Sequence, residues 1–418
     1  MLREFRREYR KRHGDLTGFD SIGPFIELVK EIGAYPQFVT ITDGVNEPTC
    51  VIDGRNYLLF NANNYLSMSE EPSVKEAAKA AVEKYGIGPG SSRCISGNID
   101  VIVELERVIA DLTRTEDCLT FPAGYMVNVT LFHAVLDPFF LGMPCEKGSA
   151  EVFYDERNHG SVEDGLALSR TKRTVFAHND LEDLERKLAA SEVPNRLIVT
   201  EGVYSIEGEI APVPDYIALK KKYGAWLMVD DAHGIGVVGP TGGGVGEHFD
   251  CSDGIDLLMG SMDKAFGGTG GYVCAKKHVV DYLRIACRSS MLSSALPCSM
   301  AAAMIEAIRI TRSDEARRAR MNGNAKYVRD GLLRLGFEVL GDANLPSIPL
   351  LLGDEYRSIA FEQKLFERGI FGSVFRWPAA PQGKARLRIV VMANHRREHL
   401  DAFLTACAEI GAELGMIQ

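Results

Sequence analysis

The sequence predicts an α/β fold built on a mixed, mostly parallel sheet with crossover helices. Between residues 115 and 276, short apolar runs rich in β-forming residues alternate with helical patterns, as they do in such sheets. With 418 residues, 46% of them hydrophobic and 25% charged, the chain can bury the cores of two or three domains. The nine cysteines include no C-x-x-C pair, so we expect neither a zinc site nor a disulfide framework, and a reducing, cytoplasmic setting.

Seven strands are expected within the alternating segment, and four helices within it or directly after it. The expected strands are residues 118–121, 151–154, 174–177, 196–201, 225–229, 257–261 and 271–275. The expected helices are residues 162–169, 181–190, 215–223 and 279–287. Ligands of α/β sheets bind at the carboxyl ends of the strands, so the residues that follow these strands are the first candidates for a site.

The chain divides into three expected parts. Residues 1–58 form an N-terminal segment with a helix and a hairpin near 51–55, and residues 59–296 form a large α/β domain. Residues 297–418 form a smaller α+β domain, in which a long helical segment runs through Asp330 and a closing helix begins near Arg396. The strands of this domain are expected near residues 337–340, 348–352, 371–375 and 386–392.

The charge of the chain argues against nucleic acid as a partner. The net charge is -10, whereas binding to a phosphate backbone requires a basic surface. The one basic cluster, residues 3–12, contains acidic residues and lacks the apolar run of a signal peptide, so we expect a solvated helix that lies on a partner subunit. No apolar stretch approaches the roughly 20 residues that cross a bilayer, and no transmembrane segment is expected.

Lys264 is the most informative residue. It follows the expected strand 257–261 among small residues that leave room for an aromatic ring. Strand 225–229 leads into Asp230 and His233, so an amine, a carboxylate and an imidazole reach one sheet edge. Such a lysine can hold the aldehyde of pyridoxal phosphate as a Schiff base, while the aspartate keeps the pyridine nitrogen protonated. Taken singly, Lys264 could be a surface residue, and Asp230 with His233 could form a strand-terminal turn.

Three further groups are candidates for the same site. Residues 121–128 supply a strand, small residues and a helix start, where backbone N–H groups can bind a phosphate. His159 follows another strand at a helix start, although a satisfied turn histidine is an equal alternative. Residues 386–389 alternate arginine with apolar residues as an edge strand would. Arg388 could grip a substrate carboxylate there, or both arginines could be solvated.

These motifs, from about Asn61 to about His395, together resemble those of the α-oxoamine synthase family of pyridoxal phosphate-dependent acyltransferases. The matching stretches are residues 63–67 for N-x-Y-L-G, 123–128 for S-G-Y/F-x-x-N, 200–208 for T-E-G-V-F/Y-S-M-D-G, and a complete V-D-D-A-H-G at 229–234. The resemblance implies a fold-type I, aspartate aminotransferase-like transferase with pyridoxal 5′-phosphate as its cofactor and no metal. It also implies a homodimer with the active sites at the interface.

The resemblance also implies roles for individual residues. His159 would stack on the cofactor ring, Asp230 would meet the pyridine nitrogen, and His233 would lie with Ser205 near the 3′ oxygen; with Lys264, the first three are the expected catalytic residues. The other expected cofactor-binding residues are Ala123, Gly124, Tyr125, Glu201, Ser261 and Ser294, the last of which would reach the phosphate of the other subunit. The expected substrate-binding residues are Asn63, Arg376 and Arg388, of which Arg388 matches a carboxylate-binding arginine.

Four residues depart from the family pattern. Ala123 replaces the serine of the phosphate turn, and Ser67 replaces a glycine. Asp263 stands immediately before the lysine, and Ile102 occupies the position of a frequent histidine. These departures leave the cofactor assignment intact but do not place the chain within one subfamily.

The implied reaction is a decarboxylative Claisen-type condensation of an amino acid with an acyl thioester of coenzyme A or of an acyl carrier protein. Lys264 would remove the α-proton and His233 or a nearby donor would polarise the new carbonyl, giving an α-aminoketone, carbon dioxide and free thiol. Two rival readings stay open. The same cofactor could serve aldol cleavage, transamination or simple decarboxylation, or the chain could be an inactive subunit that stabilises a partner. Neither the amino acid nor the acyl chain can be predicted from the sequence.

Overall fold

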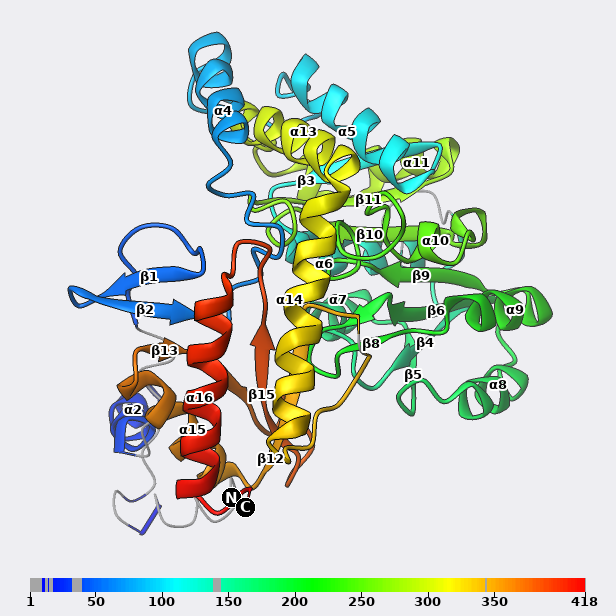
Figure 1. The fold of residues 1–418 in the computed structure, drawn as a ribbon. Coiled ribbons are helices and arrows are strands. Elements are labelled where there is room, and N and C mark those ends of the chain that lie inside the picture. The colour runs from blue at the N-terminus through cyan, green and yellow to red at the C-terminus, as the bar shows by residue number, and fades with distance from the viewer. Residues whose placement is uncertain are drawn as a thin grey trace.

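The large sheet has seven strands in the order β3-β11-β10-β9-β6-β4-β5 (Figure 1). The computed structural model describes residues 10–11, 14, 18–31, 40–137, 144–342 and 344–417. The strands are β3 (Asp117–Phe121), β4 (Ala150–Asp155), β5 (Lys172–Phe176), β6 (Asn195–Glu201), β9 (Trp226–Asp230), β10 (Leu257–Ser261) and β11 (Gly271–Ala275). Among these seven, β11 alone runs against its neighbours, which confirms the expected mixed, mostly parallel sheet.

Helices cover both faces of this sheet. One face packs against α6 (Gly124–Leu136), α7 (Gly160–Ser169) and α11 (Lys277–Ala286). The other packs against α5 (Asp100–Thr113), α8 (Leu181–Ala189), α9 (Val213–Tyr223) and α13 (Cys298–Ser313). Because successive side chains of a strand point to opposite faces, β3 sends Cys118 into one core and Leu119 into the other. The four helices expected from the sequence are all present as α7, α8, α9 and α11.

The N-terminal hairpin is confirmed. Strands β1 (Thr49–Ile52) and β2 (Arg55–Leu59) pair antiparallel, and the two residues between them, Asp53 and Gly54, have φ of 49° and 74°. Positive φ at both positions is what a tight two-residue hairpin requires. Helix α2 (Ile22–Glu31) precedes the hairpin. The basic helix expected at residues 3–12 lies outside the described residues apart from Arg10 and Lys11.

The C-terminal part contains a second, antiparallel sheet in the order β12-β15-β14. Its strands are β12 (Ser347–Gly353), β14 (Ser373–Phe375) and β15 (Ala385–Val390). Helices α14 (Glu315–Arg334), α15 (Glu355–Glu367) and α16 (Arg397–Glu413) enclose a separate apolar core against this sheet. Figure 1 shows α14 alongside α16 and reaching from the small sheet toward the large one.

Four expectations for this part were wrong. Strand β15 is central and not an edge strand, because β12 and β14 pair with its two sides. Residues 337–340 form no strand and contribute one isolated bridge between Val339 and Leu350. The strand expected at 371–375 is split, because β13 (Ile370–Phe371) pairs with β2 whereas β14 pairs with β15. The long helical segment is interrupted at Asp314, whose side chain accepts a hydrogen bond from the backbone N–H of Arg317 and so begins α14.

Five further elements belong to the fold. They are α4 (Pro72–Tyr85), α10 (Gly244–His248), α12 (Arg288–Met291), β7 (Val203–Tyr204) and β8 (Glu209–Ile210). Buried side chains of α13 belong to a core of the large sheet, whereas α14 joins the small core from Ala325 onward. The expected domain division at 296/297 stays a prediction.

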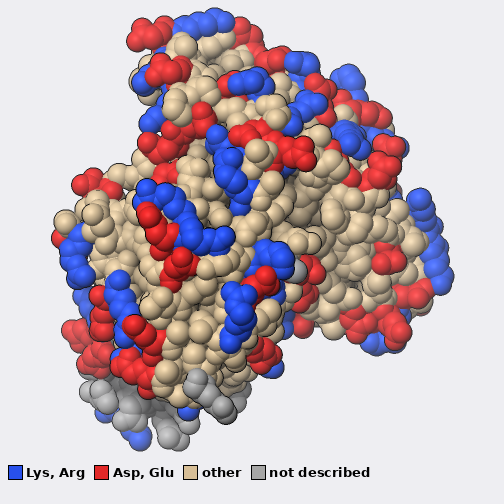
Figure 2. Space-filling view, viewed as in Figure 1, with Lys and Arg blue, Asp and Glu red and all other residues tan. Residues whose placement is uncertain are grey.

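No helix in the described ranges is long and apolar enough to span a membrane. On the face shown in Figure 2, basic and acidic residues are interspersed.

Candidate active site

Several strands of the large sheet deliver polar side chains to one edge. Strand β9 ends at Asp230, β6 ends at Glu201, and β10 ends at Ser261, three residues before Lys264. Parallel strands that end at the same edge bring such residues together. They line a pocket of about 890 Å³. The other expected site residues that line it are Asn63, Ala123, Gly124, Tyr125, His159, Ser205, His233 and Arg388.

Two expected site residues do not line this pocket. Ser294 forms an isolated bridge with Ser92, so its expected contact with the other subunit stays a prediction. Arg376 lies near Glu362, where burial raises the pKa of the carboxyl to about 7 against the opposing effect of the Arg376 charge.

The start of α6 can bind a phosphate. Its first residue, Gly124, follows Ala123, and no side chain caps the helix, so its first N–H groups are free to bind a ligand anion. A Cβ atom at Gly124 would lie 3.1 Å from the Ser261 hydroxyl, closer than an ordinary contact, so glycine here favours the close approach of Ser261 to the helix start. Ala123 has an extended conformation and adds no capping hydroxyl, which leaves Ser261 as the nearby side-chain donor.

Asp230 is buried and held by two hydrogen bonds. Its Oδ2 accepts from Asn128 Nδ2 at 2.8 Å, and its Oδ1 accepts from the backbone N–H of Ala232 at 3.1 Å. Each oxygen keeps a free lone pair for a ligand cation. The next residue, Asp231, is absent from the pocket lining. Its Oδ2 accepts from the backbone N–H of Val245, and burial raises its pKa well above the usual range.

Glu201 lies directly beside Asp230 on the neighbouring parallel strand. Burial raises the pKa of Glu201 well above its usual value, and the charges of Asp230 and Glu207 raise it further. The protonated form of Glu201 is therefore favoured. A neutral Glu201 places no second negative charge beside the Asp230 carboxyl.

His159 begins α7 beside the phosphate turn. Its Nδ1 lies 2.7 Å from the Ser161 hydroxyl and 3.3 Å from the Ser161 backbone nitrogen. The ring meets Tyr125 edge to face, with centroids 6.4 Å apart. The imidazole is thus fixed in direction where it lines the pocket.

Lys264 and His233 also line the pocket. The Lys264 amine lies 3.4 Å from Asp263, which is too long for a strong ion pair and leaves the amine available. Burial lowers the pKa of His233 well below its usual value, and the charges of Lys264 and Arg388 act in the same direction. His233 is therefore neutral. The hydroxyl of buried Tyr65 lies 2.7 Å from His233 Nδ1 and fixes the ring.

Arg388 is a buried cation without an acidic partner among the described residues. Its two terminal nitrogens donate to Ser205 Oγ and Asn63 Oδ1, both at 3.2 Å, and its Nε has no partner. The guanidinium also lies over the Phe375 ring at 4.9 Å. Burial lowers the pKa of Arg388, so an incoming carboxylate would offset the cost of burying this charge.

Sequence reasoning assigned no role to Asn128, Ser161 or Tyr65. Asn128 ends the phosphate-turn motif and Tyr65 lies in the N-x-Y-L stretch, so both motifs contained the signal. Their partners Asp230 and His233 are more than 100 residues away along the chain, as the hydrogen bonds show. A motif read locally does not predict such a contact.

Comparison with known proteins identifies the family. The family model for aminotransferases of class I and II matches residues 55–406. The 8-amino-7-oxononanoate synthase of Thermoanaerobacter pseudethanolicus is 38% identical over 95% of this chain and 98% of its own length. The enzyme of the same name from Geobacter sulfurreducens is 39% identical over 95% of this chain and 99% of its own.

The chain belongs to the aminotransferase class I and II family. Among solved structures, serine palmitoyltransferase from S. paucimobilis superimposes with a TM-score of 0.89 and 29% identity, over 96% of this chain and 98% of that one. An 8-amino-7-oxononanoate synthase from Francisella tularensis has the same fold, with a TM-score of 0.72 and 24% identity over 86% of this chain and 99% of that one. These relatives and neighbours are α-oxoamine synthases, so the resemblance expected from the sequence is confirmed.

The chain is a pyridoxal phosphate-dependent acyltransferase that catalyses a decarboxylative condensation. The pocket fits this cofactor. Asp230 supplies an anion with free lone pairs, the α6 start and Ser261 supply a phosphate cradle, and Lys264 supplies an accessible amine. The fold-type I class, the cofactor and the reaction type expected from the sequence are thereby confirmed. The individual roles of the residues stay proposals.

Proposed function

We propose that Lys264, Asp230, His159, His233 and Arg388 carry the condensation in the roles expected from the sequence. Pyridoxal phosphate supplies an electron-accepting ring that stabilises negative charge at the α-carbon of an amino acid. Asp230 holds the pyridine nitrogen protonated, and the α6 start with Ser261 holds the phosphate. The observation that carries the proposal is the Arg388 guanidinium. It has no acidic partner among the described residues, and it lines the same pocket as Lys264 and Asp230.

Other residues of the pocket bind the substrates and transfer protons. Arg388 and Asn63 bind the substrate carboxylate and orient the α-carbon toward Lys264, which removes the α-proton as a free amine. Neutral His233 donates a hydrogen bond to the acyl oxygen, where negative charge develops during attack on the thioester. The sulfur leaves as a thiolate and takes a proton from solvent, the carboxylate leaves as carbon dioxide, and Lys264 returns to the α-carbon the proton that it removed.

The substrates that we propose follow from the product named by the curated relatives. 8-Amino-7-oxononanoate has nine carbons, with a carboxylate at one end, a ketone at C7 and an amine at C8. A decarboxylative condensation forms the bond between C7 and C8. Carbons 8 and 9 then come from alanine, and carbons 1 to 7 come from an acyl thioester that ends in a carboxylate.

The solved serine palmitoyltransferases favour a second candidate, the condensation of serine with a long, uncharged acyl thioester. This similarity covers as much of the chain but rests on 29% identity, against 38% for the first. The decisive experiment is a thiol-release screen that pairs alanine or serine with seven-carbon dicarboxylic and sixteen-carbon acyl thioesters of coenzyme A and of an acyl carrier protein. We expect thiol and carbon dioxide in equal amounts, fastest with alanine and the dicarboxylic thioester. Release with serine and the long chain alone would favour the second candidate, and release without any amino acid would contradict both.

We also propose that the chain forms a homodimer through the surface around Ser294. The apolar side chains of Ile87, Ile95 and Leu292 are 82%, 78% and 72% exposed. The Ser92–Ser294 bridge and a hydrogen bond from Cys94 to Met291 join the two segments that carry them. A patch of this kind marks a protein interface, and a second copy would bring its own Ser294 to it.

A further inference from the structure

The side-chain amide of Asn128 lies between Asp230 and Ser161. Its Nδ2 is 2.8 Å from Asp230 Oδ2 and 2.9 Å from Ser161 Oγ, and all three residues are buried. An ionised carboxylate only accepts hydrogen bonds, so the amide nitrogen, and not the amide oxygen, faces Asp230. Both N–H bonds of Asn128 are therefore committed, one to Asp230 and one to Ser161.

Ser161 connects Asn128 to His159 through its hydroxyl group. Because Ser161 Oγ accepts a hydrogen bond from Asn128, its own proton is free to be donated to His159 Nδ1 at 2.7 Å. The backbone N–H of Ser161 points at the same Nδ1 at 3.3 Å, and a backbone N–H can only donate. Nδ1 of His159 is therefore an acceptor, and the proton of the neutral ring is on Nε2.

We propose that Asn128 and Ser161 are positioning residues that connect Asp230 to His159 and hold His159 as the neutral Nε2–H tautomer. The inference rests on the proposed function in one respect, namely that the cofactor ring lies between Asp230 and His159. The physical benefit is electrostatic. A ring protonated at its nitrogen carries positive charge, and a neutral imidazole adds no like charge beside it. The same hydrogen bonds fix the Asp230 carboxylate in one orientation.

The tautomer can be measured in the cofactor-free protein by nitrogen NMR of 15N-labelled histidine. We expect His159 of the wild-type protein at neutral pH to give one protonated Nε2 signal and one unprotonated Nδ1 signal. Ser161→Ala removes the hydroxyl donor and the link to Asn128 but keeps the weaker backbone N–H donor at 3.3 Å, so the Nε2–H tautomer should lose population to the Nδ1–H tautomer, whereas Ser161→Thr keeps the hydroxyl and should retain the wild-type pattern. A protonated Nδ1 in the wild type, or identical spectra for wild type and Ser161→Ala, would overturn the proposal.

The link to Asp230 has a separate readout in cofactor affinity. Asn128→Ala removes one hydrogen bond to a charged carboxylate, so the Kd for pyridoxal phosphate should rise roughly tenfold or more. Asn324→Ala is a matched control, because Asn324 donates to backbone carbonyls of Met392 and His395 outside the pocket and should leave this Kd unchanged. Wild-type affinity in Asn128→Ala would contradict the role of Asn128. If the wild-type protein shows the expected tautomer but releases no thiol with any substrate pair, the proposed function is wrong, whereas the positioning role of Asn128 and Ser161 is still supported.

Discussion

Asp230 and Asp231 are adjacent acids with opposite environments. Asp230 lines the pocket and accepts hydrogen bonds at both oxygens, whereas Asp231 lies outside the pocket lining. Cβ atoms at Gly202, Gly234 and Gly244 would each approach an Asp231 oxygen to 2.3 Å or less, so only glycines can surround this carboxyl so tightly. One acid belongs to the site and the other to the interior that supports it.

This difference predicts opposite effects of two isosteric substitutions. Asp230→Asn removes the anion that holds the pyridine nitrogen protonated, so kcat should fall roughly 100-fold or more. Asp231→Asn replaces a carboxyl that burial already favours in its neutral form, so kcat should change little. Steady-state thiol release measures both. Equal losses in the two variants would contradict the assignment of Asp230.

At the residue scale, the sequence predicted the pocket well but not its supports. The lysine, the aspartate and both histidines follow strand ends, and strand ends can be predicted from hydrophobic patterns. Arg388 was expected on an edge strand because arginine alternates with apolar residues. Instead, Leu387 and Ile389 point into the small core. Arg386 and Arg388 point to the other face of the strand, and both are buried. Burial of an arginine depends on partners distant in the chain, which periodicity does not predict.

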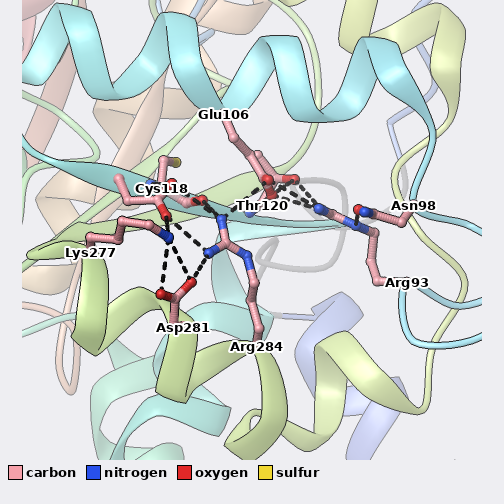
Figure 3. A network of polar contacts seen from close by, with 9 residues as sticks. Arg93, Asn98, Glu106, Cys118, Thr120, Lys277, Asp281 and Arg284 are labelled. Atoms are coloured by element: carbon pink, nitrogen blue, oxygen red, sulfur yellow. Dashed lines mark hydrogen bonds and ion pairs between the residues drawn. The ribbon is translucent and has the colours of Figure 1, made fainter.

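At the scale of elements, a buried ion pair ties the loop after α4 to the large sheet. Figure 3 shows Arg93 of this loop facing the Glu106 carboxylate of α5, with Arg284 of α11 approaching from another side. Arg93 bonds both Glu106 oxygens at 2.7 and 3.0 Å, and Thr120 of β3 donates its backbone N–H to Glu106 at 2.8 Å. The loop thereby holds Ser92 in its bridge with Ser294.

Glu106→Gln should therefore destabilise the protein strongly. The amide cannot accept from every present donor and leaves the largely buried Arg93 charge, whose side chain is 11% exposed, uncompensated, which costs about 3 kcal/mol of unfolding free energy. The matched control is Glu104→Gln on the same helix. Glu104 pairs with Arg107 at an exposed position, so its loss should cost less than about 1 kcal/mol. Urea unfolding monitored by circular dichroism measures both, and similar costs would contradict the anchoring role of Glu106.

Two of the departures from the family pattern can be described by their place in the helices and turns of the structure. Ile102, which replaces a frequent histidine, is fully buried in α5 within a core of the large sheet. Ser67 adopts φ of 53°, a conformation in which glycine is favoured, and this explains the usual residue there but not the serine. The sequence alone identified both substitutions, but their burial and backbone conformation required the packed structure.

At the scale of the whole molecule, the proposed homodimer depends on its exposed apolar patch. Leu292→Glu places a charge in that patch and should shift the protein from dimer to monomer, because burying an unpaired carboxylate costs several kcal/mol. Sedimentation velocity measures the change. Ile285→Glu is a matched control, since Ile285 is 65% exposed on α11 and lies outside the patch. A dimeric Leu292→Glu protein would contradict this placement of the interface.

The pH dependence of stability has a specific source in His395, which is buried where the small core meets the β1–β2 hairpin. Burial lowers the pKa of His395 to about 3, while its Nδ1 accepts from Met392 and its Nε2 donates to Leu59. A histidine with a lowered pKa contributes full stability above its unfolded value of about 6.5 and loses it as the pH falls toward the folded value. The wild-type protein should therefore lose roughly 1.4 kcal/mol per pH unit below about pH 6 relative to His395→Gln, which does not titrate. Urea unfolding of both proteins at pH 7, 6 and 5 measures this difference, and parallel curves would contradict it.

The covalent link between Lys264 and the cofactor is the central claim, and peptide mapping after reduction tests it most directly. The purified protein is loaded with pyridoxal phosphate, treated with sodium borohydride, digested and analysed by mass spectrometry, with Lys264→Ala as the control. We predict a phosphopyridoxyl group on Lys264 in the wild-type protein and no specifically modified lysine in the variant. A wild-type protein modified at another lysine, with Lys264 unmodified, would contradict the account.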